Sequence, residues 1–230
     1  SGETRRVRGG NQRLAEALAG ELPRSPVRGV SVRAIHHDAT RVRIRTEADE
    51  VEADACVVAA PCALVGYIDF EPALPAELAT ELRSIPMSTA AKLAVGLRAP
   101  LPARAVMSVP HRFWAWTTPS DRVLGSWAGA ESVVGALGVA DGDPATWLAR
   151  LRELWPAVEP GDETALLTVW DGSSWSRGAY SVLRNAEEGP RGISPRVIFA
   201  GEHTAAEWSG TMEGALRSGR RAAADVQALA

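Results

Sequence analysis

One segment near the end of the chain limits the possible folds more than any other. It runs from Val197 to Glu202 (VIFAGE) and is followed by a loop and by a stretch rich in glycine, alanine and serine up to Ala224. A short apolar run of this kind predicts a buried strand, and the small residues after it predict a closely packed helix. Because a helix N-terminus carries unpaired N–H groups, the segment predicts a place where a ligand meets the start of that helix.

The composition is that of a globular chain. With 230 residues and 46% hydrophobic content, the chain can bury the core of one large domain or two small ones. A formal net charge of -3 gives no electrostatic reason to expect nucleic acid or an anionic membrane as a partner. No run approaches the roughly 18 to 20 apolar residues of a spanning helix, and the arginine-rich start lacks the core of a signal peptide. A cytoplasmic location is therefore expected.

Two residue pairs of the types that bind metals or form disulfides have simpler interpretations here. Cys56 and Cys62 flank the apolar residues 57–61, and such a pair is expected to be two reduced thiols in the core. His36 and His37 have no third ligand at a useful spacing, so the sequence predicts a solvated turn over residues 36–40 and no metal.

Periodicity predicts the other elements, and their order indicates a mixed α/β fold. The expected elements are a helix over residues 11–22, a hairpin over 30–44, a strand over 50–61 buried on both faces, a helix after Pro75, a small antiparallel sheet within 101–140 and a helix after Asp143. No Gly-x-Gly-x-x-Gly turn, the device that cradles a dinucleotide pyrophosphate, occurs in the sequence.

Periodicity does not explain two further features. Lys92 is a single cation inside the apolar run of residues 88–97, and because lysine is rarely buried without a partner, spacing alone favours a place at a sheet edge. Trp170 and Trp175 lie five residues apart among glycine and serine, with neither helical nor strand spacing. They are open to two interpretations, as aromatics that line a cavity or as ordinary surface and core residues.

These motifs, in this order, resemble the C-terminal half of the flavin-containing amine oxidases. That family includes monoamine oxidases, polyamine oxidases, L-amino-acid oxidases and the flavin-dependent histone demethylases. The resemblance extends from Gly9 to Val226 and also includes the Phe-x-Pro-x-Leu-Pro crossing that begins at Phe70. It implies two incomplete domains, with residues 1–70 and 190–230 in a Rossmann-like FAD-binding domain and 71–189 in a substrate domain with a mixed or antiparallel sheet.

The resemblance also implies FAD as the cofactor and a set of contacts for it. Residues that match the family's cofactor-binding positions are Val32, Gly201, Glu202, Gly210, Thr211 and Met212. The carboxylate of Glu202 would contact ribityl or ribose hydroxyls, and the helix that starts at Thr211 would face the flavin edge where negative charge develops. Ala179 stands where monoamine oxidases carry the cysteine that attaches flavin, so non-covalent binding is implied.

The activity implied is oxidation of an amine or amino acid to an imine, with hydride transfer to flavin N5 and reduction of oxygen to hydrogen peroxide. Lys92 matches the family lysine that holds a water beside N5, and the residues that match the substrate pocket are Trp170, Trp175, Gly178 and Tyr180. Thr211 stands where monoamine oxidases place a second pocket tyrosine, so their substrate range is not implied.

The family's N-terminal half has no counterpart in the sequence. The expected partner is therefore a second polypeptide that carries the Gly-x-Gly-x-x-Gly half, as in a nicked or two-gene enzyme. Two alternatives stay open: a truncated chain, with Ser1-Gly2 as a cloning remnant, or a flavin-less relative that acts as a binding or scaffolding subunit. A scaffold has no need of Lys92 or Glu202, which argues against the last alternative.

Overall fold

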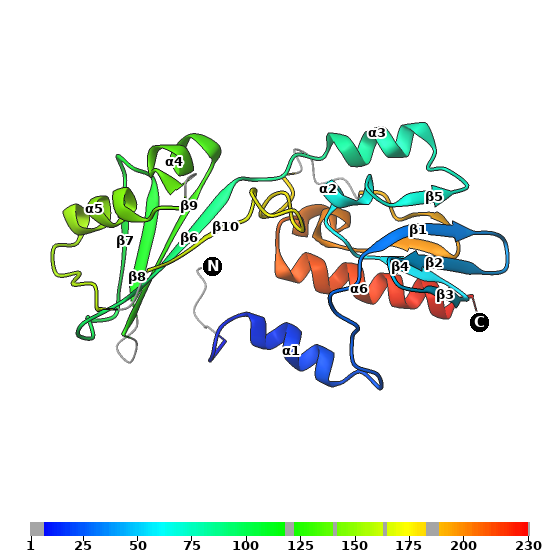
Figure 1. Cartoon of the computed structure of the whole chain (residues 1–230), viewed down its shortest axis with the longest axis horizontal. Helices are drawn as coiled ribbons and strands as arrows, with labels where there is room; N and C mark the ends of the chain where they lie inside the picture. The colour runs from blue at the N-terminus through cyan, green and yellow to red at the C-terminus, as the bar shows by residue number, and fades with distance from the viewer. Residues whose placement is uncertain (1–6, 118–121, 140–141, 163–164, 183–188, 230) are drawn as a thin grey trace.

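The computed structural model describes residues 7–117, 122–139, 142–162, 165–182 and 189–229, which form two lobes (Figure 1). The terminal lobe combines strands from both ends of the sequence, namely β1 to β5, β11 and β12, with helices α2, α3 and α6. The middle lobe contains β6 to β10 with α4 and α5. The segments that lead into β6 and out of β10 join the lobes (Figure 1). The predicted mixed α/β class is confirmed.

The terminal lobe contains two small sheets. In one, β2 (Val42–Thr46) lies antiparallel between β1 (Val32–His37) and β3 (Glu50–Ala53), and β5 (Asp69–Glu71) pairs parallel with β1. In the other, β12 (Val197–Phe199) lies between antiparallel β11 (Gly192–Ser194) and parallel β4 (Cys56–Val58). Within the described part of the chain, β4 is therefore an edge strand with one unpaired side.

Three helices complete this lobe. Helices α2 (Cys62–Val65) and α3 (Ala76–Ser84) pack on a hydrophobic cluster that includes Ile35, Leu82 and Phe199. Helix α6 (Met212–Gln227) buries only small residues, Gly214, Ser218 and Ala222, which recur every four positions and let it approach β12 closely. Leu82 belongs to this cluster, so α3 packs with elements that precede residue 70; the expected domain boundary at residue 70 stays a prediction.

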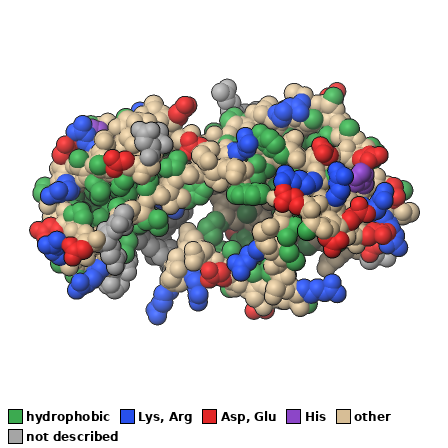
Figure 2. Space-filling view, in the orientation of Figure 1, with side chains coloured by type: hydrophobic (Ala, Val, Ile, Leu, Met, Phe, Trp, Pro, Cys, Tyr) green, Lys and Arg blue, Asp and Glu red, His purple; other side chains and the backbone are tan. Residues whose placement is uncertain are grey.

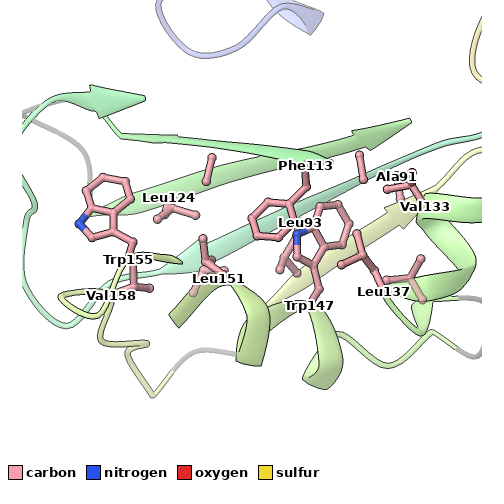
Figure 3. Packing of buried hydrophobic residues seen from close by; sticks show 14 of the residues in the cluster. Ala91, Leu93, Phe113, Leu124, Val133, Leu137, Trp147, Leu151, Trp155 and Val158 are labelled. Carbon is pink, nitrogen blue, oxygen red and sulfur yellow. The ribbon is translucent and has the colours of Figure 1, made fainter. Parts of the chain in front are cut away.

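The middle lobe is one antiparallel sheet in the order β10-β6-β9-β8-β7, covered on one face by helices. Its strands are β6 (Ala90–Gly96), β7 (Arg104–Ser108), β8 (Phe113–Thr117), β9 (Val123–Gly129) and β10 (Leu166–Val169), and its helices are α4 (Glu131–Ala136) and α5 (Ala145–Leu154). Trp147 of α5 contacts Phe113 edge-on at a centroid distance of 6.2 Å (Figure 3). The predicted antiparallel sheet is confirmed.

Two local predictions are wrong for reasons of position. The run 50–61 forms two strands, β3 and β4, and Val57 is 40% exposed because nothing in the described chain covers that face at the sheet edge. His36 and His37 are the last residues of β1, paired with β2, so the turn begins after them. Both cysteines are free thiols, as expected.

The predicted N-terminal helix is present but packs on nothing in the described chain. Helix α1 (Gln12–Gly20) has no buried residue, and Leu18 and Leu22 are 50% and 54% exposed. Figure 1 places it apart from both lobes. Its apolar stripe is therefore a surface without a partner inside the described structure.

Candidate functional site

Glu202 is the central hydrogen-bonding group of the predicted site. Its carboxylate accepts hydrogen bonds from the Ser181 backbone N–H at 2.8 Å, the Ser181 hydroxyl at 2.6 Å and the Gly210 backbone N–H. Glu202 thus joins the end of the 170–181 segment to the turn before α6. A carboxylate offers about four acceptor positions, so roughly one remains for a ligand hydroxyl.

The start of α6 has free backbone N–H donors, as expected for a helix whose N-terminus meets a ligand. Thr211 caps the helix, because its hydroxyl accepts the Gly214 N–H at 3.0 Å and donates to the Trp208 carbonyl at 2.6 Å. The N–H groups of Met212 and Glu213 have no acceptor among the described residues. Met212 is 48% exposed, so these two donors can meet an anionic group from outside.

Gly201 links the strand to this turn by close packing. Its φ of 134° favours glycine, and a Cβ there would lie 2.5 Å from the His203 ring. Its N–H donates to the Ser218 hydroxyl at 2.9 Å, which fixes the strand end against α6. Burial lowers the pKa of His203, while the nearby Glu202 acts in the opposite direction. The net effect favours the neutral form of the imidazole ring.

Lys92 lies on the face of the middle sheet that the helices leave open. Ala91 and Leu93 point into the core, whereas the Lys92 side chain is exposed and its Nζ lies 5.7 Å from the centre of the Trp170 ring. No carboxylate pairs with it among the described residues. The cation is therefore available to hold a water or a polar ligand group.

The same open face is strongly aromatic. Residues directly opposite one another across the strands form the row Thr168, Lys92, Trp127, Trp114 and Met107. Trp116 lies over Gly125, where a Cβ would be 2.8 Å from its ring. Trp114 is 46% exposed, and hydrophobic side chains gather around the hollow between the lobes (Figure 2). The alternation of Trp114 and Trp116 in the sequence predicts the strand, but it does not indicate which face the helices leave open.

The four expected pocket residues do not all lie together. Trp170 stands beside Lys92, and Tyr180 lies against Gly210, where a Cβ would be 3.3 Å from the tyrosine ring. Gly178 is buried against Met87. Trp175 is 71% exposed and lines a different space, a cleft of about 490 Å³ that also contains Val32.

The residues present fit the expected dinucleotide. The cleft runs along Val32, Val57 and Trp175, and none of the described residues that line it is acidic. The free N–H groups of α6 and the remaining acceptor position of Glu202 suit the negative edge and the hydroxyls of a flavin, respectively. Sequence reasoning missed Ser181, whose only signal is its place directly after the Gly-x-Tyr motif.

Two other kinds of site find no support in the described residues. No group of three or more His, Cys, Asp or Glu side chains gathers there to hold a metal ion. None of the described helices is both long and apolar enough to cross a membrane.

Comparison with known proteins finds relatives that match nearly the whole chain. The profile of the flavin containing amine oxidoreductase family matches residues 1–227. The chain is 27% identical to AofH of Mycobacterium tuberculosis, assigned as a flavin-containing monoamine oxidase, over 97% of this chain and 52% of AofH. It is 25% identical to the L-amino acid dehydrogenase of Synechocystis, over 99% of this chain and 52% of that protein.

Solved structures show the same fold. A triple mutant of putrescine oxidase superposes with a TM-score of 0.83 at 22% identity, over 96% of this chain and 53% of that one. Cyclohexylamine oxidase from Brevibacterium oxydans superposes with a TM-score of 0.67 at 23% identity, over 86% of this chain and 48% of that one. The chain spans about half the length of the curated relatives it matches.

Proposed function

Because the chain belongs to the flavin containing amine oxidoreductase family, whose cofactor is FAD, we propose that it forms half of an FAD-dependent enzyme that oxidises an amine or amino acid. The products are an imine and, after reoxidation of the flavin by oxygen, hydrogen peroxide. The observation that carries the proposal is the bridge made by Glu202, which links the free donors of α6 to the segment whose first tryptophan contacts Lys92.

FAD, when bound, accepts the hydride equivalent that leaves the carbon next to the substrate nitrogen. Met212 and Glu213 present their N–H groups, and the dipole of α6 stabilises negative charge there by about 0.3–1 kcal/mol. Lys92, whose Nζ lies 5.7 Å from the centre of the Trp170 ring, would hold a water beside the flavin. An apolar aromatic surround favours the neutral form of an amine, which is the reactive form.

Binding of FAD is non-covalent in this proposal. The residue before the pocket tyrosine is Ala179, which has no atom that can attach a flavin, and its N–H donates to the Ser88 carbonyl at 2.9 Å. The two thiols of the chain are also unsuitable, because burial raises the pKa of Cys56 and raises that of Cys62 to about 11.

A further polypeptide segment completes the enzyme in this proposal, and it supplies the glycine-rich dinucleotide turn. Three surfaces of the described chain are suited to receive it: the unpaired side of β4, the apolar stripe of α1 and the open face of the middle sheet. A strand added beside β4 would pair with the backbone N–H and C=O groups on its open side. The segment can belong to a second chain, which is the arrangement we favour.

Native mass spectrometry of the purified protein tests the proposal in one measurement. We expect a mass above the 24.4 kDa of this chain by one further polypeptide and one FAD. A peroxide-coupled screen of amines and L-amino acids then tests turnover. A complete complex that binds no flavin and forms no peroxide would contradict the proposal and favour a scaffolding subunit.

A further inference from the structure

The cleft of about 490 Å³ in the terminal lobe is lined by apolar residues, two exposed aromatic rings and two cations. The rings are Tyr67 and Trp175, which are 62% and 71% exposed, and the cations are Arg33 and Arg177. Within the part of the chain that the structure describes, no carboxylate lines the cleft. Such a lining suits a ligand that has flat rings and a negative charge.

The two cations differ in how far their charge is already used. Arg33 forms an ion pair with Glu47. The guanidinium of Arg177 lies 4.4 Å from the centre of the Tyr67 ring, and none of the described residues offers it a carboxylate or carbonyl partner. Stacking on a ring leaves the in-plane N–H donors of a guanidinium free to bind an anion.

The backbone around Arg177 is firmly held. Its N–H donates to the Ser173 carbonyl at 2.9 Å, and the Ser176 hydroxyl donates to the Trp170 carbonyl at 2.7 Å. Arg177 has a φ of 51°, a conformation that is costly for a residue with a side chain and persists where the surroundings impose it. The fixed turn therefore presents Trp175 and Arg177 together to the cleft.

Three other arginines that the structure describes lie outside the cleft. Arg98 pairs with Asp162 at 3.5 Å, Arg104 lies 5.5 Å from the Trp155 ring, and Arg112 contacts the Ser132 hydroxyl at 3.4 Å. Arg177 differs from these three arginines because it lines the same cleft as Val32. An anionic group that binds Arg177 would therefore belong to the ligand of the cleft.

We propose that Arg177 binds a phosphate group of the dinucleotide cofactor, with Tyr67 holding the guanidinium in place. The inference rests on the proposed function, since the dinucleotide is the family's FAD. Arg177 is thus a cofactor-binding residue supplied by the chain half that lacks the glycine-rich turn. The competing source of negative charge is the carboxylate of an amino-acid substrate.

Equilibrium binding of FAD, ADP and riboflavin to the complete complex tests the assignment. We expect Arg177→Gln to weaken the binding of FAD and ADP about ten- to a hundredfold and to leave riboflavin, which has no phosphate, unchanged. Arg177→Lys should recover part of the loss, because it keeps the charge without the planar fork. Increasing salt should weaken FAD binding less in Arg177→Gln than in the wild type.

Arg83→Gln is the matched control, because Arg83 lines the neighbouring groove with Arg177 but not the cleft. Equal FAD affinity in wild type and Arg177→Gln, with both folded, would overturn the inference alone. A rise in KM for L-amino acids with unchanged FAD affinity would assign Arg177 to the substrate carboxylate and also overturn it. A wild-type complex that binds neither FAD nor ADP would contradict the proposed function as well.

Discussion

Two glycines of helix α6 provide a paired test of how that helix is positioned. Gly214 lies in its first turn and is buried, and a Cβ there would lie 2.2 Å from the Trp208 carbonyl oxygen and 3.1 Å from the Ala205 Cβ. Gly219 lies five residues later on the exposed side and has nothing within 4 Å of the same added atom. An alanine at position 214 would therefore collide with the preceding turn, whereas an alanine at position 219 would contact nothing.

The two substitutions are expected to change the free energy of unfolding in opposite directions. Gly219→Ala should raise the free energy of unfolding by about 0.5–1 kcal/mol, because glycine costs that much within a helix. Gly214→Ala gains the same term, but the ordinary separation of such atoms exceeds 3.4 Å, so the helix start must move by more than an ångström. Overpacking of this kind costs about 1–3 kcal/mol, so after the helix gain is subtracted a net loss of about 1 kcal/mol follows.

Thermal unfolding measures both effects. At roughly 2–4 °C per kcal/mol for a chain of this size, Gly214→Ala should lower Tm by about 2–4 °C and Gly219→Ala should raise it. The affinity for FAD should fall only in Gly214→Ala, since the N–H groups of Met212 and Glu213 are displaced. If Gly214→Ala were as stable as Gly219→Ala, the close approach of α6 to Trp208 would be refuted.

Three further outcomes are expected. Lys92→Met should slow flavin reduction or reoxidation more than tenfold in stopped-flow experiments with FAD still bound, and unchanged turnover would remove Lys92 from the mechanism. Because burial lowers the pKa of His203 below 6.5, this group stabilises the fold above pH 6.5 and the contribution is lost as pH falls; His203→Gln should flatten the acid side of the unfolding free energy against pH, and an unaltered slope would contradict this. Cys62, with its pKa raised to about 11, should react with iodoacetamide at pH 8 only after unfolding; equal rates before and after would count against its burial.

Regular packing was the part of the fold that the sequence could predict. The apolar face of α5, with Trp147 and Leu151, repeats at helical spacing, and the Asp143 carboxylate accepts the Ala145 N–H at 2.9 Å, as its place before a proline suggests. The strand β12 and helix α6 follow from an apolar run and a small-residue repeat. These elements depend on neighbours that are close in the sequence or on burial of one face.

The errors concern position within the sheet and long-range partners. Val57 belongs to an apolar run, but its side chain lines the open cleft and is 40% exposed, which local pattern cannot indicate. Trp175 and Trp170 belong to one motif, yet the turn held by Ser173 and Ser176 directs them to different spaces. Side-chain direction in a non-repeating segment is set by such hydrogen bonds and not by periodicity.

The hydrogen-bond partners of Glu202 indicate a structural role in addition to the expected contact with the cofactor. A carboxylate that only contacted a cofactor would face the ligand with most of its acceptor positions, whereas Glu202 already accepts three hydrogen bonds from Ser181 and Gly210. Ser181 also forms a β-bridge with Met87, three residues before β6, the strand that carries Lys92. The Ser88 N–H donates to the Tyr180 carbonyl at 2.8 Å. The free donors of α6 and the Lys92 cation are thus fixed relative to each other through one partly buried carboxylate. Because hydrogen bonds to a charged group contribute about 1.5–3 kcal/mol each, this junction keeps the spacing between the two lobes on which a flavin and its substrate would both depend.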